Sequence, residues 1–199
     1  MTRSVRRWLA RRKYRGVIFG RCAASKAELG GSMYADIQLE DGAPAELAAS
    51  ADSTFGTYDL MAYALTYYGG VVETCTKRIG VESESSMHTE GIASVRASDR
   101  IIYARDVLCV LGVPAVRPTV LLTDSKAGML VMNNAGSSAR SRHFLRMYRI
   151  IQQRIQCEQI TVKHVPDSEN AADVLTKWVD KTKFERCVAY LTGERATPS

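Results

Sequence analysis

Apolar residues in the centre of the chain fall into short runs with strand character, separated by turn residues. Such β-branched and aromatic residues fit a pleated, half-buried surface. Strands are predicted over residues 46–52, 60–68 and 71–79, with Gly69 and Gly70 marking a tight turn between the second and the third. Because the connections are short, we expect the three strands to pair antiparallel.

The pattern becomes helical after Ser85. Apolar residues recur at the spacing of one helix face over about 25 residues, and Gly112 and Pro114 then end the segment. Downstream, strands are predicted at 119–123 and 160–165, a turn at 166–170, and helices at 126–132, 142–156, 171–178 and 184–191. This order predicts an α/β domain with a layered sheet of mixed strand direction.

The N-terminal segment differs from the rest in charge. Residues 1–27 contain nine Lys or Arg and no Asp or Glu, so the net charge of +6 comes from this segment. A basic helix over 4–14, a strand over 17–20 and a strand-like patch over 33–39 are predicted. A block of this kind is typical of contact with nucleic acid, although a solvated helix face or an organellar transit peptide has a similar composition.

Composition narrows the class of protein. The chain has 199 residues, which suits one domain with an extension. Its five cysteines have neither zinc-ligand spacing nor a disulfide pattern, so we expect free thiols in a reducing compartment. No apolar run approaches the ~20 residues that span a bilayer, and arginines interrupt any secretory signal. We therefore expect an intracellular protein with no membrane partner.

Four carboxylates fall where predicted elements begin or end: Asp52, Glu90, Asp124 and Asp173. Strand ends and helix starts can converge at one edge of a sheet, and converging carboxylates repel one another unless a metal neutralises them. Hard oxygen ligands suit Mg²⁺ or Mn²⁺, and two such ions about 4 Å apart promote phosphodiester hydrolysis. Asp also occurs at these positions for turn and capping reasons, so spacing alone leaves both explanations open.

Four short motifs carry a resemblance to a known family, in this order and at these intervals. They are SSMHTEGIA at 85–93, LTDSKA at 122–127, SRHF at 141–144 and NAADVLTK at 170–177. They resemble the helix Glu motif, the strand Asp motif, the basic R-[ST]-[KR]-H helix and the terminal A-D-x-[FL]-T-K motif of copia-type retrotransposon ribonuclease H. In addition, VRRWL at 5–9 with GVIF at 16–19 is similar to the segment that joins the polymerase to ribonuclease H, which favours a connector over a transit peptide.

The resemblance implies the ribonuclease H fold, in which three antiparallel strands are followed by alternating helices and strands of one mixed sheet. It also implies a catalytic tetrad of four carboxylates that binds two Mg²⁺ or Mn²⁺ ions. The tetrad residues are Asp52, Glu90, Asp124 and Asp173. The first match is the weakest, because ADSTFG at 51–56 departs from the family's D-A-D-W-A-G. Asp59 and Asp36 therefore remain alternatives for the first carboxylate.

Further residues are candidates by position. His164 lies nine residues before Asp173, where many ribonucleases H carry a mobile His that shuttles protons or helps product leave, although a lone His is also a common surface residue. The candidates for nucleic-acid binding are the basic residues near the proposed site: Lys126, Arg140, Arg142, His143 and Arg146. They would follow the phosphates of a hybrid duplex or, alternatively, solvate a helix face.

The function implied is an endonuclease that hydrolyses the RNA strand of RNA/DNA hybrids during reverse transcription. Its partners would be the hybrid and the reverse transcriptase domain of the same polyprotein, in a cytoplasmic virus-like particle or the nucleus. Residues 1–42 would be a basic connector from the polymerase region, 43–192 the ribonuclease H-like domain and 193–199 a tail. Two alternatives remain: an inactive, degenerate or domesticated module that binds nucleic acid or a protein, and another nuclease or resolvase on the same fold.

Overall fold

The fold is given by a computed structural model that describes residues 47–67, 70–81, 83–133 and 142–192, with the backbone alone over 142–146. The segments predicted at 4–14, 17–20 and 33–39, the turn at Gly69, and the proposed connector and tail lie outside these residues. Within the described ranges, no helix has the length and apolar character needed to cross a membrane.

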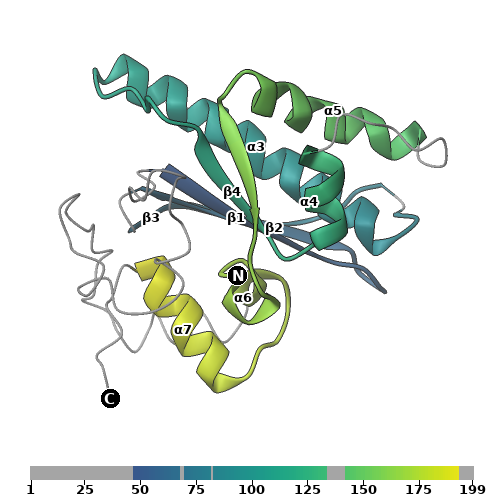
Figure 1. The fold of residues 1–199 in the computed structure, drawn as a ribbon. Coiled ribbons are helices and arrows are strands. Elements are labelled where there is room, and N and C mark those ends of the chain that lie inside the picture. The colour runs from purple at the N-terminus through teal and green to yellow at the C-terminus, as the bar shows by residue number, and fades with distance from the viewer. Residues whose placement is uncertain (1–46, 68–69, 82, 134–141, 193–199) are drawn as a thin grey trace.

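Strands and helices alternate after an initial three-stranded meander (Figure 1). The elements are β1 (Leu47–Thr54), β2 (Leu60–Tyr67), β3 (Gly70–Arg78), α3 (Ser86–Val110), β4 (Thr119–Thr123), α4 (Lys126–Asn133), α5 (Arg142–Gln156), β5 (Ile160–His164), the 3₁₀ turn η1 (Asp167–Glu169), α6 (Asp173–Thr176) and α7 (Lys181–Thr192).

The strands form one mixed sheet with the order β3-β2-β1-β4-β5. β1, β2 and β3 pair antiparallel, whereas β4 runs parallel to β1 and β5 runs parallel to β4. The predicted fold class is confirmed. Since β1, β4 and β5 run the same way, their C-terminal ends reach one edge of the sheet, where loops carry polar side chains.

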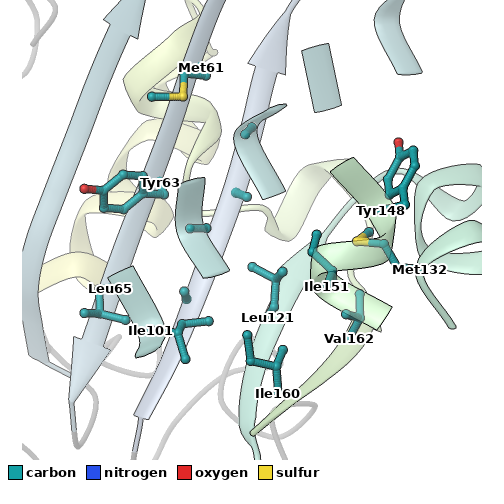
Figure 2. Close-up of a cluster of buried hydrophobic side chains, with 14 of the residues drawn as sticks. Met61, Tyr63, Leu65, Ile101, Leu121, Met132, Tyr148, Ile151, Ile160 and Val162 are labelled. Atoms are coloured by element: carbon teal, nitrogen blue, oxygen red, sulfur yellow. The ribbon is translucent and has the colours of Figure 1, made fainter. Parts of the chain in front are cut away.

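Helices cover both faces of the sheet, with α3, α4 and α5 on one face and α6 and α7 on the other (Figure 1). Alternate residues of a strand point to opposite faces, and β1 shows the consequence. Ala49 and Ala51 belong to the core cluster beneath α3 and α5, part of which Figure 2 shows, whereas Ala48 belongs to the cluster with α6 and α7. Asp52 therefore lies on the α6 side of β1, and Ser53 on the α3 side.

Helix α3 packs closely against its neighbours because small residues line its inner face. A Cβ atom added to Gly91 would lie 3.1 Å from the hydroxyl oxygen of Tyr148 on α5, which is closer than most Cβ contacts in proteins. That hydroxyl donates a hydrogen bond of 2.9 Å to the backbone carbonyl of Met87. The contact fixes the first turns of α3, including Glu90, relative to α5.

The boundaries of α3 and β1 follow local chemistry. Ser85 caps α3 by accepting a hydrogen bond from the His88 backbone N–H, and Gly112, at φ +78°, ends the segment after Val110 as predicted. β1 continues past its predicted end at residue 52 as far as Thr54, because Thr54 still pairs with Leu60.

The last two helices differ from their predicted ranges. The helix predicted over 171–178 is only the four-residue α6, because the backbone becomes extended at Lys177 (φ −134°, ψ 166°). The helix predicted over 184–191 begins at Lys181, because the Asp180 carboxylate accepts a hydrogen bond of 2.9 Å from the Lys183 backbone N–H. The chain is thereby turned so that Lys177 and Lys183 both reach the site described next.

Candidate metal centre

Three of the predicted carboxylates meet at the edge where β1 and β4 end. Asp52 comes from β1, Glu90 from the second turn of α3, and Asp124 directly follows β4. Each offers a carboxylate oxygen, and these oxygens lie within 4.8 Å of one another. We call Asp52, Glu90 and Asp124 the first triad.

A second group of carboxylates adjoins the first and shares Asp124 with it. Asp124, Asp167 and Asp173 also offer oxygens within 4.8 Å of one another, and we call them the second triad. Asp173 is fully buried at the start of α6, whereas the Asp167 side chain is 67% exposed in η1. The sequence-based prediction included Asp173 but not Asp167, which falls in a predicted turn, and no local motif marks it.

Two hydroxyl groups hold the first triad in place. The Ser53 hydroxyl donates a 2.6 Å hydrogen bond to Oε1 of Glu90, and Thr176 of α6 donates one to Oδ2 of Asp52. Since Ser53 and Asp52 point to opposite faces of β1, the end of this strand is tied to α3 through Glu90 and to α6 through Thr176.

A buried asparagine places Asp173. The Asn170 side chain is completely buried, and its Nδ2 donates a 3.0 Å hydrogen bond to the backbone carbonyl of Ala51. Its Oδ1 accepts a 3.2 Å hydrogen bond from the Ala172 backbone N–H. Asn170 therefore ties the start of α6 to β1, one residue from Asp52. Asn170 belongs to the terminal motif, but the motif alone predicted no role for it.

Two lysines that were not among the predicted site residues contact the carboxylates. Lys177 Nζ lies 3.2 Å from Oδ2 of Asp173, 3.2 Å from Oδ1 of Asp167 and 3.8 Å from Oδ1 of Asp52. Lys183 Nζ lies 2.8 Å from Oδ2 of Asp167 and is also hydrogen-bonded to Oδ2 of Asp173. The sequence signal for Lys177 is its place in the terminal motif, whereas Lys183 has none.

Two carboxyl groups of the first triad, Asp52 and Glu90, have pKa values that their surroundings raise towards neutral pH. Burial, reinforced by the nearby Asp173, raises the pKa of Asp52 from 3.8 to about 8, although Thr176 and Lys177 oppose the change. Burial also raises the pKa of Glu90, from 4.5 to about 7, with a further rise from Asp124 and opposition from the Ser53 hydrogen bond. The charged forms of both groups are therefore disfavoured unless a cation binds.

The second triad is balanced by the lysines. Burial raises the pKa of Asp173, even though Lys183 and Lys177 favour its charged form. In the exposed Asp167, the hydrogen bond from Lys183 lowers the pKa. Burial alone would lower the pKa of Lys177, but the charges of Asp52 and Asp173 outweigh it and raise that pKa. The ammonium groups thus stay charged beside these carboxylates.

The oxygen atoms present fit a divalent cation. Oε2 of Glu90 and Oδ1 of Asp173 are buried and have no hydrogen-bond partner within the described part of the chain. Buried oxygens without partners are rare in proteins, and an ion that binds them would remove the penalty. All the donors are carboxylates, which suits Mg²⁺ or Mn²⁺.

Asp52 fits the site better than its alternatives do. Asp59 lies in the β1–β2 connection, where its Oδ1 accepts a 3.0 Å hydrogen bond from the Gly56 backbone N–H, and it belongs to neither triad. Asp36 lies outside the described residues. The geometry therefore favours Asp52 as the first carboxylate, while the catalytic role of each tetrad member stays a prediction.

The other predicted site residues are placed only in part. Nε2 of His164 lies 3.1 Å from the backbone carbonyl oxygen of Asp124, at the end of β5 and next to the triads. Lys126 is exposed at the start of α4. The remaining candidates have no described side chain: Arg140, Arg142, His143 and Arg146. Their proposed contacts with nucleic acid stay predictions.

Comparison with solved structures shows that the fold is ribonuclease H-like. The ribonuclease H1 named LC11-RNase H1, isolated from compost by a metagenomic approach, superposes with a TM-score of 0.53 at 17% identity, over 65% of this chain and 91% of its own. At that identity the likeness shows the fold alone. No protein-family model matches the chain.

In sequence, the chain is similar to retrotransposon polyproteins. It is 29% identical over 125 residues to the retrovirus-related Pol polyprotein from transposon TNT 1-94 of Nicotiana tabacum, covering 63% of this chain and 9% of the polyprotein. It is 26% identical over 115 residues to the Pol polyprotein from transposon RE1 of Arabidopsis thaliana, covering 58% and 8%. These matches confirm the resemblance to copia-type retrotransposons. The chain spans under a tenth of either polyprotein.

Proposed function

We propose that the chain is a metal-dependent endonuclease that hydrolyses the RNA strand of RNA/DNA hybrids during reverse transcription. The observation that carries this proposal is the convergence of Asp52, Glu90 and Asp124 within 4.8 Å at the edge of a ribonuclease H-like sheet. The similarity to two Pol polyproteins supports the setting of reverse transcription.

Two divalent cations, held by the first and second triads, would activate a water and stabilise the oxygen that departs from the phosphodiester. Asp124 belongs to both triads and would contact both ions. Ser53 orients Glu90, and Thr176 orients Asp52, before substrate arrives. This removes a reorganisation cost from the reaction. His164, next to Asp124, would take up a proton or assist product release.

Substrate selection would depend on duplex shape and on the ribose hydroxyls. The 2′-hydroxyl distinguishes RNA from DNA at a given site, so base identity would matter little. Lys126, exposed two residues after Asp124, and the basic residues predicted at 140–146 would contact phosphates of the hybrid. The reverse transcriptase domain of the same polyprotein would be the protein partner.

The test is a substrate panel with the purified chain and Mg²⁺. Labelled RNA/DNA hybrid, RNA/RNA duplex and DNA/DNA duplex of one sequence are compared, with Asp124→Asn as the inactive control and Asp59→Asn as the matched control. We expect cleavage of the hybrid's RNA strand by the parent and by Asp59→Asn only. A folded parent that binds the hybrid without cutting it would instead favour the inactive nucleic-acid-binding module.

A further inference from the structure

The two triads differ in the positive charge that already surrounds them. Lys183 contacts Asp167 and Asp173, both members of the second triad, through a side chain that is only 12% exposed. Lys177 contacts the same two residues at 3.2 Å and reaches the first triad only at the longer distance of 3.8 Å, at Asp52. The second triad therefore already holds two ammonium groups.

Lys183 and a divalent ion would compete for the same two carboxylate groups. Oδ2 of Asp173 accepts the Lys183 hydrogen bond, and Oδ2 of Asp167 accepts another at 2.8 Å. A Mg²⁺ ion binds carboxylate oxygens at about 2.0–2.1 Å, so an ion between these two residues would lie in the space next to the ammonium group. Two cations at such a separation repel strongly in a partly buried site.

The two lysines leave one buried oxygen of the second triad without a partner among the described residues. Asp173 is completely buried, and its Oδ1 has no hydrogen-bond partner among the described residues. Lys177 and Lys183 both approach the other oxygen, Oδ2. The lysines thus interact with Oδ2 only, and the buried Oδ1 can bind a further cation.

Building on the proposed function, we propose that Lys183 is a resident cation of the second triad, so that the two ion positions fill in order. The first ion binds Asp52, Glu90 and Asp124. The second binds Asp124, Asp167 and Asp173 only when the Lys183 ammonium, still charged, moves off Asp173. Asp167 is in this scheme a metal-facing carboxylate that the sequence did not reveal, and Lys183 is a positioning residue that sets the affinity for the second ion.

The test measures Mn²⁺ binding to the full chain by titration calorimetry, with no nucleic acid present. The parent is expected to bind one ion tightly and a second at least about tenfold more weakly, a difference of about 1.4 kcal/mol. Lys183→Met should tighten the second ion about tenfold and leave the first within about twofold. Lys183→Arg, which keeps the charge, should behave as the parent does.

The matched control is Lys181→Met, because Lys181 lies on the same helix with a side chain that is 86% exposed. It should change neither affinity. Equal tightening of both ions by Lys183→Met would show a general charge effect and overturn the proposal, as would an unchanged second ion. Should Lys183→Met not fold, NMR of lysine Nζ groups in the parent still decides: the Lys183 signal should move with the second Mg²⁺ equivalent, and movement with the first would contradict the ordering.

Failure of this inference differs from failure of the proposed function. If the parent cleaves hybrid but Lys183→Met leaves the second ion unchanged, only the role of Lys183 is wrong. If the ions bind in the stated order and no hybrid is cut, only the nuclease proposal is wrong.

Discussion

Replacing Asp52 by Asn should stabilise the protein when no divalent ion is present. Asp52 is 1% exposed, and its pKa rises from 3.8 to about 8 on burial beside Asp173. One pKa unit corresponds to about 1.4 kcal/mol, so the fold loses about 4 kcal/mol at pH 7 relative to a neutral side chain. Asn keeps the shape and an acceptor for Thr176, so we expect a gain of about 2–4 kcal/mol.

The sign of the effect also fixes its pH dependence. A group whose pKa is raised in the folded protein binds its proton more tightly there, so its neutral form favours folding at low pH and this contribution is lost as pH rises. The parent and Asp52→Asn should therefore be about equally stable near pH 4. The difference should grow as pH rises from 3.8 towards about 8, the pKa of Asp52 in the fold.

Thermal and urea unfolding in EDTA, followed by circular dichroism across this pH range, measures the effect. For a domain of about 150 residues, 1 kcal/mol shifts the melting temperature by about 2–4 °C, so Asp52→Asn should melt about 5–15 °C higher at pH 7. Saturating Mg²⁺ should raise the stability of the parent more than that of the variant. A variant that is less stable at pH 7, or a difference that does not depend on pH, would show that burial of the charged Asp52 carboxylate does not destabilise the fold.

Three further changes test single contacts. Gly91→Ala should not give the gain of about 1 kcal/mol that Ala usually gives over Gly within a helix, because the new methyl group would lie 3.1 Å from the buried Tyr148 hydroxyl; a urea midpoint raised by that full amount would contradict this. Glu73→Gln should cost about 0.5–1 kcal/mol at pH 7, since Glu73 pairs with Arg100 at 2.8 Å on a partly exposed surface. Burial raises the Glu73 pKa, but the hydrogen bonds from Arg100 and Tyr63 outweigh it and lower the pKa below 4.5, so the cost should disappear as pH falls below 4.5. Asp59→Asn should leave the Mg²⁺ dependence of hybrid cleavage unchanged, and a shift would reopen the choice of first carboxylate.

Much of the fold could be predicted because its signals are local. Alternating small and apolar residues define β1 and β2, and Ser85 and Gly112 bound α3 by capping chemistry that can be read along the chain. The four-residue α6 could not be predicted in the same way. The backbone becomes extended at Lys177, whose ammonium group contacts Asp167 and Asp173, and these contacts form only once the chain has folded back.

The candidate site was predictable to the extent that its residues lie in motifs. Glu90, Asp124 and Asp173 are each embedded in one, whereas Asp52 needed the geometry of the strand end to separate it from Asp59. Asp167 is different, because its neighbours in sequence resemble any polar turn. It reaches the carboxylates through the η1 turn, which no pattern of apolar residues marks.

We propose that this carboxylate cluster hydrolyses the RNA strand of a hybrid with the help of divalent ions. The most direct measurement is the single-turnover cleavage rate of a labelled hybrid, titrated with Mg²⁺ for the parent and for Asp124→Asn. We expect that cleavage rises with Mg²⁺, stops with EDTA and falls at least about a thousandfold in the variant, the order of loss that follows removal of a central catalytic group. A folded parent without activity, or cleavage that Asp124→Asn leaves intact, would contradict it.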